Sequence, residues 1–69
     1  MRFAIVTEKG PRSCGAYIPD LPGCVAVAKS LAEVPKLITE AVVLHLEGLR
    51  EDGLPIPEPS SSCEYVDVA

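Results

Sequence analysis

The thiols and the imidazole are the first residues of this chain to consider for chemistry. The 69 residues include three cysteines and one histidine. Cys14, Cys24 and Cys63 are odd in number, have no Cys-x-x-Cys spacing and do not cluster with His45, so neither a disulfide framework nor a zinc site is indicated. Unpaired thiols of this kind predict a reduced, cytoplasmic protein. On strands, they are more often small core residues than reactive groups.

His45 has two readings. A histidine can be a general base or a pH sensor, but this one falls on the apolar face of a predicted helix, with no nucleophile and no orienting carboxylate evident beside it. A packed side chain with one hydrogen bond is the favoured reading, and a role beyond packing stays open. We therefore predict no catalytic residue, no metal ligand and no cofactor.

Residues 17–24, YIPDLPGC, predict a rigid turn between two strands. Pro19 and Pro22 fix their φ angles, and Gly23 can adopt a positive φ. Asp20 can accept a hydrogen bond from the backbone just ahead of it. A structural role for Asp20 and a contact with a partner are both open at this stage.

The composition bounds the size and the partners of the protein. At 69 residues the chain predicts one domain, residues 1–69, whose small core favours self-association. The net charge is −4 and the six basic residues are scattered, which does not favour nucleic-acid binding. An acidic surface suits a basic protein partner or simply maintains solubility. No run approaches the ~20 apolar residues of a membrane span, and the N-terminal apolar run is too short for a signal peptide.

Three segments have the composition of strands: residues 2–7, 14–18 and 24–28. The polar turn between the first two contains Gly and Pro side by side, which favours a hairpin. The connection between the second and third is too short for a crossover, so all three should form an antiparallel meander. Cys14, Ala16 and Ile18 alternate with larger or more flexible neighbours and predict one small, apolar face.

A long helix is predicted to follow, ending near Asp52. Ser30 and Glu33 match a capping box, in which each side chain satisfies the other residue's backbone amide. Pro35 lies about one turn further on, where it removes a helical hydrogen bond. We therefore expect an irregular first turn, or a helix that begins effectively at Pro35. Gly53 is the expected C′ residue.

The helix carries more apolar surface than one sheet requires. Its core stripe recurs at steps of three and four residues and contains Leu31, Val34, Ile38, Ala41, Val42, His45 and Leu49. Leu37, Val43 and Leu44 lie outside this stripe. This second apolar surface predicts a protein contact, or a surface covered by the C-terminal part of the chain.

The C-terminal part predicts an extended segment and a fourth strand. Proline at every second position prevents a helix in residues 54–59. Residues 63–68 alternate as a strand, and the intervening helix favours parallel re-entry beside the first strand through a right-handed crossover. The expected fold class is α+β: a three-stranded antiparallel meander, one long helix packed on the sheet, and a fourth strand parallel to the first (β-β-β-α-β, order 3-2-1-4).

The sequence resembles the HicB-like antitoxins. The resemblance rests on four stretches in family-like order and spacing: residues 17–24, 30–33, 45–49 and 52–60. It implies a degraded ribonuclease H-like fold and an antitoxin that neutralises a HicA toxin, a small basic ribonuclease that cuts mRNA. Pro35 departs from the family pattern. The chain stops at Ala69 with no helix-turn-helix or ribbon-helix-helix domain, so the resemblance implies a stand-alone form without direct nucleic-acid binding.

The ribonuclease H resemblance raises the question of two-metal hydrolysis, which needs several convergent carboxylates. In such folds the first strand supplies an essential aspartate, and residues 2–7 contain no acidic residue. The remaining acids, Glu40, Glu47, Glu64 and Asp67, are expected on a solvated helix face and an edge strand. A residual metal-dependent nuclease is therefore the least favoured reading, and we predict that the protein is not an enzyme.

The favoured hypothesis is an antitoxin that binds a HicA-like toxin and occludes its active site. The alternative is a stand-alone homo-oligomeric binding module without a toxin partner. The residues expected to contact a partner are Asp20, Leu21, Leu37 and Leu44. A homo-oligomer in the cytoplasm, with no membrane association, is expected in both cases.

Overall fold

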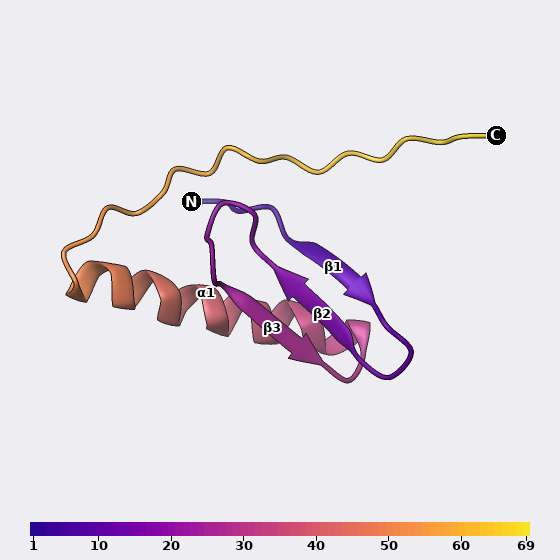
Figure 1. Ribbon diagram of the computed structural model, residues 1–69, viewed down its shortest axis with the longest axis horizontal. Coiled ribbons are helices and arrows are strands. Elements are labelled where there is room, and N and C mark those ends of the chain that lie inside the picture. Colours follow the sequence, from indigo (N-terminus) through magenta and orange to yellow (C-terminus); the bar gives the residue numbers. More distant parts are fainter.

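The computed structural model describes residues 1–69 and has α+β architecture. Three strands, β1 (Val6–Lys9), β2 (Cys14–Tyr17) and β3 (Val25–Ala28), precede a 3₁₀ turn η1 (Leu31–Glu33) and a long helix α1 (Val34–Glu51). The strands form one antiparallel sheet in the order β1-β2-β3. Helix α1 lies across one face of this sheet (Figure 1) and extends beyond its end. The predicted meander with one helix is confirmed.

The first strand lies further along the chain than expected. Residues 2–7 were the predicted range, whereas β1 pairs Val6 with Tyr17 and continues to the pair Lys9 and Cys14. The hairpin turn sets this register, because the Gly10 N–H donates to the Ser13 carbonyl at 2.8 Å and brings the residues on either side of the turn together. The polar composition of Glu8 and Lys9 concealed their place in the strand.

The core is small and lies between the sheet and α1. Cys14, Ala16 and Ile18 are all buried, which confirms the predicted apolar face of the second strand. The complete set of buried residues is Cys14, Ala16, Ile18, Leu21, Cys24, Ala28, Val34 and Ile38. Leu31, expected in the core stripe, is 51% exposed. Only Val34 and Ile38 of that stripe are fully buried.

The start of the helix corrects the predicted capping box. Ser30 makes no side-chain capping bond, and the Glu33 carboxylate accepts the Lys29 N–H at 3.0 Å. Pro35 is the cause: without an N–H it cannot donate to the Leu31 carbonyl, so the chain makes a 3₁₀ turn in which the Val34 N–H donates to Leu31 instead. The expected irregular first turn is confirmed, with proline in the first positions of α1.

The end of the helix is a Schellman motif. Gly53 has φ of 68°, the left-handed region that favours glycine. Its N–H donates to the Arg50 carbonyl at 3.1 Å, and the Leu54 N–H donates to the Leu49 carbonyl at 2.9 Å. Gly53 is therefore the C′ residue, as predicted.

Residues 54–69 contain no helix and no strand. They leave the end of α1, pass the turn between β2 and β3, and continue on the β1 side of the sheet (Figure 1). Residues 63–68, the predicted fourth strand, are exposed and pair with no strand in this structure. No helix of the chain is both long enough and apolar enough to cross a membrane.

Candidate partner-binding surface

The connection between β2 and β3 consists of two successive β-turns. The Leu21 N–H donates to the Ile18 carbonyl at 3.0 Å, and the Cys24 N–H donates to the Leu21 carbonyl at 3.0 Å. Pro19 and Pro22 occupy the second position of each turn, where their fixed φ is favourable. Gly23 follows with φ of 87°, as a type II turn requires. The loop that was predicted to be rigid thus consists of two hydrogen-bonded turns.

Asp20 joins this turn to the C-terminal segment. Its carboxylate accepts hydrogen bonds from the backbone N–H of Ser60 at 3.1 Å and of Ser61 at 3.0 Å. It also accepts the hydroxyl protons of the same serines, at 3.0 Å from Ser60 and 2.8 Å from Ser61. We call this group of three residues the Asp20 clasp. It holds Ser60 and Ser61 at the turn.

The Asp20 clasp stabilises the ionised carboxylate. Hydrogen bonds from Ser61, first from its backbone and then from its side chain, and those from Ser60 lower the pKa of Asp20 from 3.8 to about 2, against a smaller opposing effect of burial. The group is therefore charged throughout the physiological range. Its acceptor capacity is directed at the chain's own serines.

Leu21 lies beside Asp20 in sequence but occupies the interior. Its side chain is 0% exposed and belongs to the core cluster. In this conformation Leu21 fixes the turn to the core and presents no side-chain surface to a partner. Its predicted contact with a partner stays untested.

Of the three helix residues that were predicted to form a second apolar surface, two are exposed. Leu44 is 68% exposed and Val43 is 49% exposed, whereas Leu37 is half-buried and packs against the core. A shallow hollow of about 390 Å³ is lined by Thr39, Glu40, Val43 and Leu44, and we call these residues the helix patch. The C-terminal segment does not cover Val43 or Leu44.

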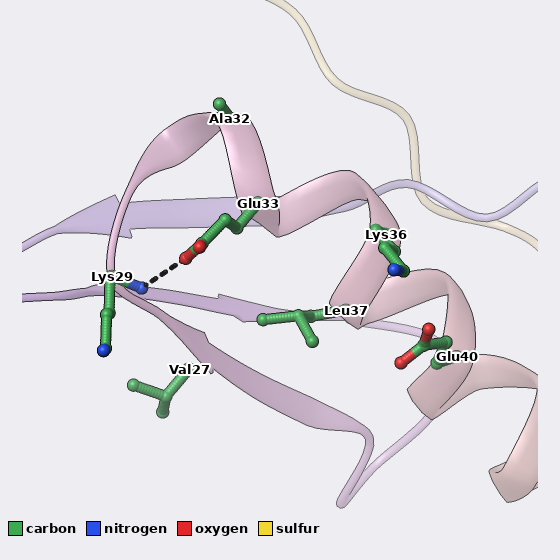
Figure 2. A pocket seen from close by; sticks show the side chains of 7 residues that line it. All are labelled: Val27, Lys29, Ala32, Glu33, Lys36, Leu37 and Glu40. Carbon is green, nitrogen blue, oxygen red and sulfur yellow. Dashed lines mark hydrogen bonds between the residues drawn. The ribbon is translucent and has the colours of Figure 1, made fainter.

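A larger groove of about 600 Å³ lies between the free edge of β3 and the first half of α1. We call it the β3 groove, and it is lined by Val27, Lys29, Ala32, Glu33, Lys36, Leu37 and Glu40. Figure 2 shows the Leu37 side chain extending from the helix toward β3, with Lys36 and Glu40 further along the helix, whereas Val27 projects from the strand on the side away from the helix. Glu40 lines both the β3 groove and the helix patch.

The structure thus separates the four predicted residues into two pairs. Asp20 and Leu21 lie on the turn between β2 and β3, where one is bonded to serines and the other is buried. Leu37 and Leu44, seven positions apart, lie two helical turns from each other along α1. Sequence analysis did not identify Ser60 and Ser61 as partners of Asp20, because no local pattern links residues 40 positions apart.

The groups first considered for chemistry lie apart from each other. Cys14 and Cys24 are buried, Cys63 is exposed, and all three are unpaired. Burial raises the pKa of the Cys24 thiol, which disfavours the reactive thiolate. His45 is half-buried on α1. No three His, Cys, Asp or Glu side chains converge in an arrangement that could hold a metal ion.

Known proteins resemble this chain in sequence and in structure. It is 47% identical over 58 residues to a UPF0150 protein of Archaeoglobus fulgidus, covering 77% of this chain and 81% of the relative. It is 30% identical over 67 residues to an uncharacterized 14.9 kDa protein from the rep-hol intergenic region of Haemophilus phage HP1. That alignment covers 97% of this chain and 50% of the phage protein, so the chain spans about half the length of that relative.

The structural likeness agrees with the sequence likeness. A chain of the solved HicA3 and HicB3 toxin-antitoxin complex matches with a TM-score of 0.76 and 30% sequence identity. The match covers 87% of this chain and 70% of that one. In addition, residues 3–68 match the family described as HicB_like antitoxin of bacterial toxin-antitoxin system. Since the match includes all strands and the helix, this chain belongs to the HicB-like antitoxin family.

Proposed function

We propose that the protein is an antitoxin that binds a HicA-type, mRNA-cleaving toxin and blocks its active site by occlusion. The main support is the likeness to a chain of the HicA3 and HicB3 complex, at 30% identity and a TM-score of 0.76. The family match over residues 3–68 supports the same role. The protein acts in the cytoplasm, without catalysis and without a cofactor.

The proposed contact combines charge with exposed apolar surface. A net charge of −4 favours encounter with a basic toxin. Leu44 and Leu37 are the proposed apolar contacts on α1, and Leu44 is the more exposed of the two. Asp20 and Leu21 contribute through the turn: Asp20 is partly exposed there, and the buried Leu21 fixes the turn to the core.

The test compares two exposed leucines. Leu44→Asp places a charge in the helix patch, whereas Leu54→Asp places the same charge at a residue that is 53% exposed and lies outside it. We expect Leu44→Asp to weaken binding to a catalytically inactive toxin roughly tenfold or more, as for a central apolar contact, and to lose rescue of toxin-arrested growth. Leu54→Asp should behave as wild type. Absence of any complex with the product of an adjacent toxin gene, and no rescue, would contradict the antitoxin role.

We also propose that residues 63–68 form the fourth strand, parallel to β1, when the protein is in its functional assembly. Two observations support this: the Asp20 clasp fixes the start of the segment, and from there it runs on the β1 side of the sheet (Figure 1). Slow amide exchange at alternate residues of 63–68 in the complex, with fast exchange at all of them in the free chain, is the expected result. Fast exchange in both would count against the strand.

A second candidate function is a homo-oligomeric binding module that has no toxin partner. The small core favours self-association, since only 8 of 69 residues are buried. Neither function requires catalysis, so incubation of the pure protein with RNA or with an RNA-DNA hybrid in Mg²⁺ or Mn²⁺ should leave both substrates intact.

A further inference from the structure

Strand β3 is a sheet edge with free backbone groups. The Ile18 N–H donates to the Cys24 carbonyl at 3.2 Å, which sets the phase of the β2–β3 ladder. Because bonding alternates along an antiparallel pair, Ala26 and Ala28 direct their N–H and C=O groups toward β2. The N–H and C=O groups of Val25 and Val27 therefore point outward.

The two edges of the sheet differ in their protection. The β1 edge carries the exposed polar residues Thr7, Glu8 and Lys9, which discourage edge-to-edge pairing with a second chain. The β3 edge has the sequence Val-Ala-Val-Ala, with no charge and no proline. Val25 is 63% exposed and Val27 is 71% exposed. Of the two edges, β3 is the one suited to pair with a strand of another chain, whereas the β1 edge is the one beside which this chain's own residues 63–68 are proposed to pair.

The charges beside β3 fit a second copy of the same surface. The β3 groove contains two basic residues, Lys29 and Lys36, and two acidic residues, Glu33 and Glu40. A two-fold contact places a surface against itself, so a balanced set of charges can form opposite pairs across the axis. A strongly basic partner would favour an acidic surface, and this groove is neutral overall.

The chain leaves more surface exposed than a compact monomer of its mass. The chain exposes 5453 Å², whereas a compact monomer of 7.3 kDa exposes about 4,200 Å². The excess of about 1,300 Å² is spread over the molecule and includes the exposed C-terminal segment; at β3 itself the unburied surface consists of Val25, Val27 and the groove of about 600 Å³ beside the strand. Burial of the β3 edge with the half-buried Leu37 beside it would also extend the small core.

We infer that two copies of this chain pair β3 to β3 in antiparallel fashion about a two-fold axis at Ala26. Val25 of one copy then lies opposite Val27 of the other, and their outward N–H and C=O groups bond to each other. The two three-stranded sheets become one continuous sheet, with both α1 helices on the same face. This inference specifies the surface of the self-association proposed above and does not depend on the toxin.

Sedimentation of matched edge variants tests the inference. Val27→Lys places a charge on the proposed edge without disturbing the core, and Thr7→Lys does the same on the opposite edge. We expect wild type and Thr7→Lys to have twice the chain mass of 7.3 kDa, and Val27→Lys to have half the wild-type mass with an unchanged circular dichroism spectrum. A folded Val27→Lys variant that keeps the wild-type mass, or a wild type that is monomeric at sub-millimolar concentration, would overturn the inference.

Disulfide trapping tests the register. In a Cys63→Ser background, Ala26→Cys places two thiols directly opposite each other at the axis, where Cα atoms of such a pair lie about 4.5 Å apart. Val27→Cys places them about 8 Å apart, beyond the ~7 Å limit for a disulfide. Mild oxidation should cross-link the first variant and not the second. The reverse result would exclude this register.

A toxin-binding assay on the same variants separates this inference from the antitoxin role. If the wild type is dimeric, Val27→Lys is monomeric, and neither protein binds the toxin, β3 pairing stands and the antitoxin proposal fails. If the wild type is monomeric in the absence of toxin, and Val27→Lys no longer binds the toxin, then the toxin occupies the β3 edge and the inference is overturned.

Discussion

Asp20 connects the turn between β2 and β3 to the C-terminal segment. Its carboxylate bonds to Ser60 and Ser61, which lie 40 and 41 positions away in sequence. Two serine N–H groups and two hydroxyls surround it, so a side chain expected to shape its own turn instead positions a distant segment. Any contact between Asp20 and a partner would compete with these bonds.

The Asp20 clasp should respond to acid. Because the pKa of Asp20 is lowered from 3.8 to about 2 in the folded protein, its contribution is fully present above pH 3.8 and is lost as the pH falls through about 2. The amide resonances of Ser60 and Ser61 should therefore shift in this range, with little change between pH 5 and 8.

Asp20→Asn provides the comparison, and Asp52→Asn the matched control at the exposed end of α1. We expect Asp20→Asn to abolish the acid transition and to increase proteolysis within residues 60–69, while Asp52→Asn leaves both unchanged. An identical titration in Asp20→Asn would show that another group is responsible.

Leucines of opposite exposure should differ sharply in their effect on stability. Leu21→Ala removes a side chain that is 0% exposed and should lower the free energy of unfolding by about 2–5 kcal/mol. Leu44→Ala, at a residue 68% exposed, should change it by less than about 0.5 kcal/mol. Urea denaturation measures both. Equal effects would mean that Leu44 is covered in solution, for instance by a second copy.

At the scale of elements, replacing each of two glycines of the helix region by alanine should change stability in opposite directions. Gly48 lies within α1 with nothing within 4 Å of the position a Cβ would take, so Gly48→Ala should raise the free energy of unfolding by about 0.5–1 kcal/mol. Gly53 also has open space but a φ of 68°, so Gly53→Ala should lower it by about 1 kcal/mol. Thermal unfolding of both variants checks the signs. A stabilising Gly53→Ala would mean that the Schellman motif is not kept in solution.

The elements were predictable where their cause is local. Pro19, Pro22 and Gly23 specify a turn by their own dihedral preferences, and the alternation from Cys14 to Ile18 specifies a buried face. Pro35 disturbs the helix start through its missing N–H, and this too is a local effect. Each of these features follows from a few adjacent residues.

The features that were missed depend on partners elsewhere in the chain. The position of β1 is set by its register against β2, which the apolar run alone does not give. The Glu33 carboxylate accepts the backbone N–H of Lys29 and not that of Ser30, because the first turn is 3₁₀. The Asp20 clasp joins residues that share no periodic pattern, so no sequence window contains both sides of it.

At the scale of the whole molecule, the two proposed contacts differ in electrostatic character. The chain as a whole has a net charge of −4, whereas the β3 groove carries equal numbers of basic and acidic residues. Association with a basic toxin should therefore depend on salt much more than self-association does.

Stopped-flow and sedimentation measurements test this difference. Raising ionic strength from about 10 mM to about 150 mM shortens the screening length from roughly 30 Å to roughly 8 Å and should lower the toxin association rate severalfold. The dimer dissociation constant should change little over the same range. A salt-independent association rate would indicate that the overall charge has no part in recognition.

Residues 54–60 are held at both ends. Their first residue is fixed at the helix end by the Leu49 carbonyl, and their last is fixed at Asp20. Prolines 55, 57 and 59 favour a polyproline II conformation with a rise of about 3.1 Å per residue, for which the stretch spans about 20 Å. Most surface connections tolerate insertion or loss of a residue. Here one inserted residue would bring Pro59 and Ser60 to the positions that face Asp20, and proline has no N–H to donate, whereas loss of one residue would bring Ser61 and Ser62 there and keep the same donors. The segment is therefore constrained against insertion and not against loss.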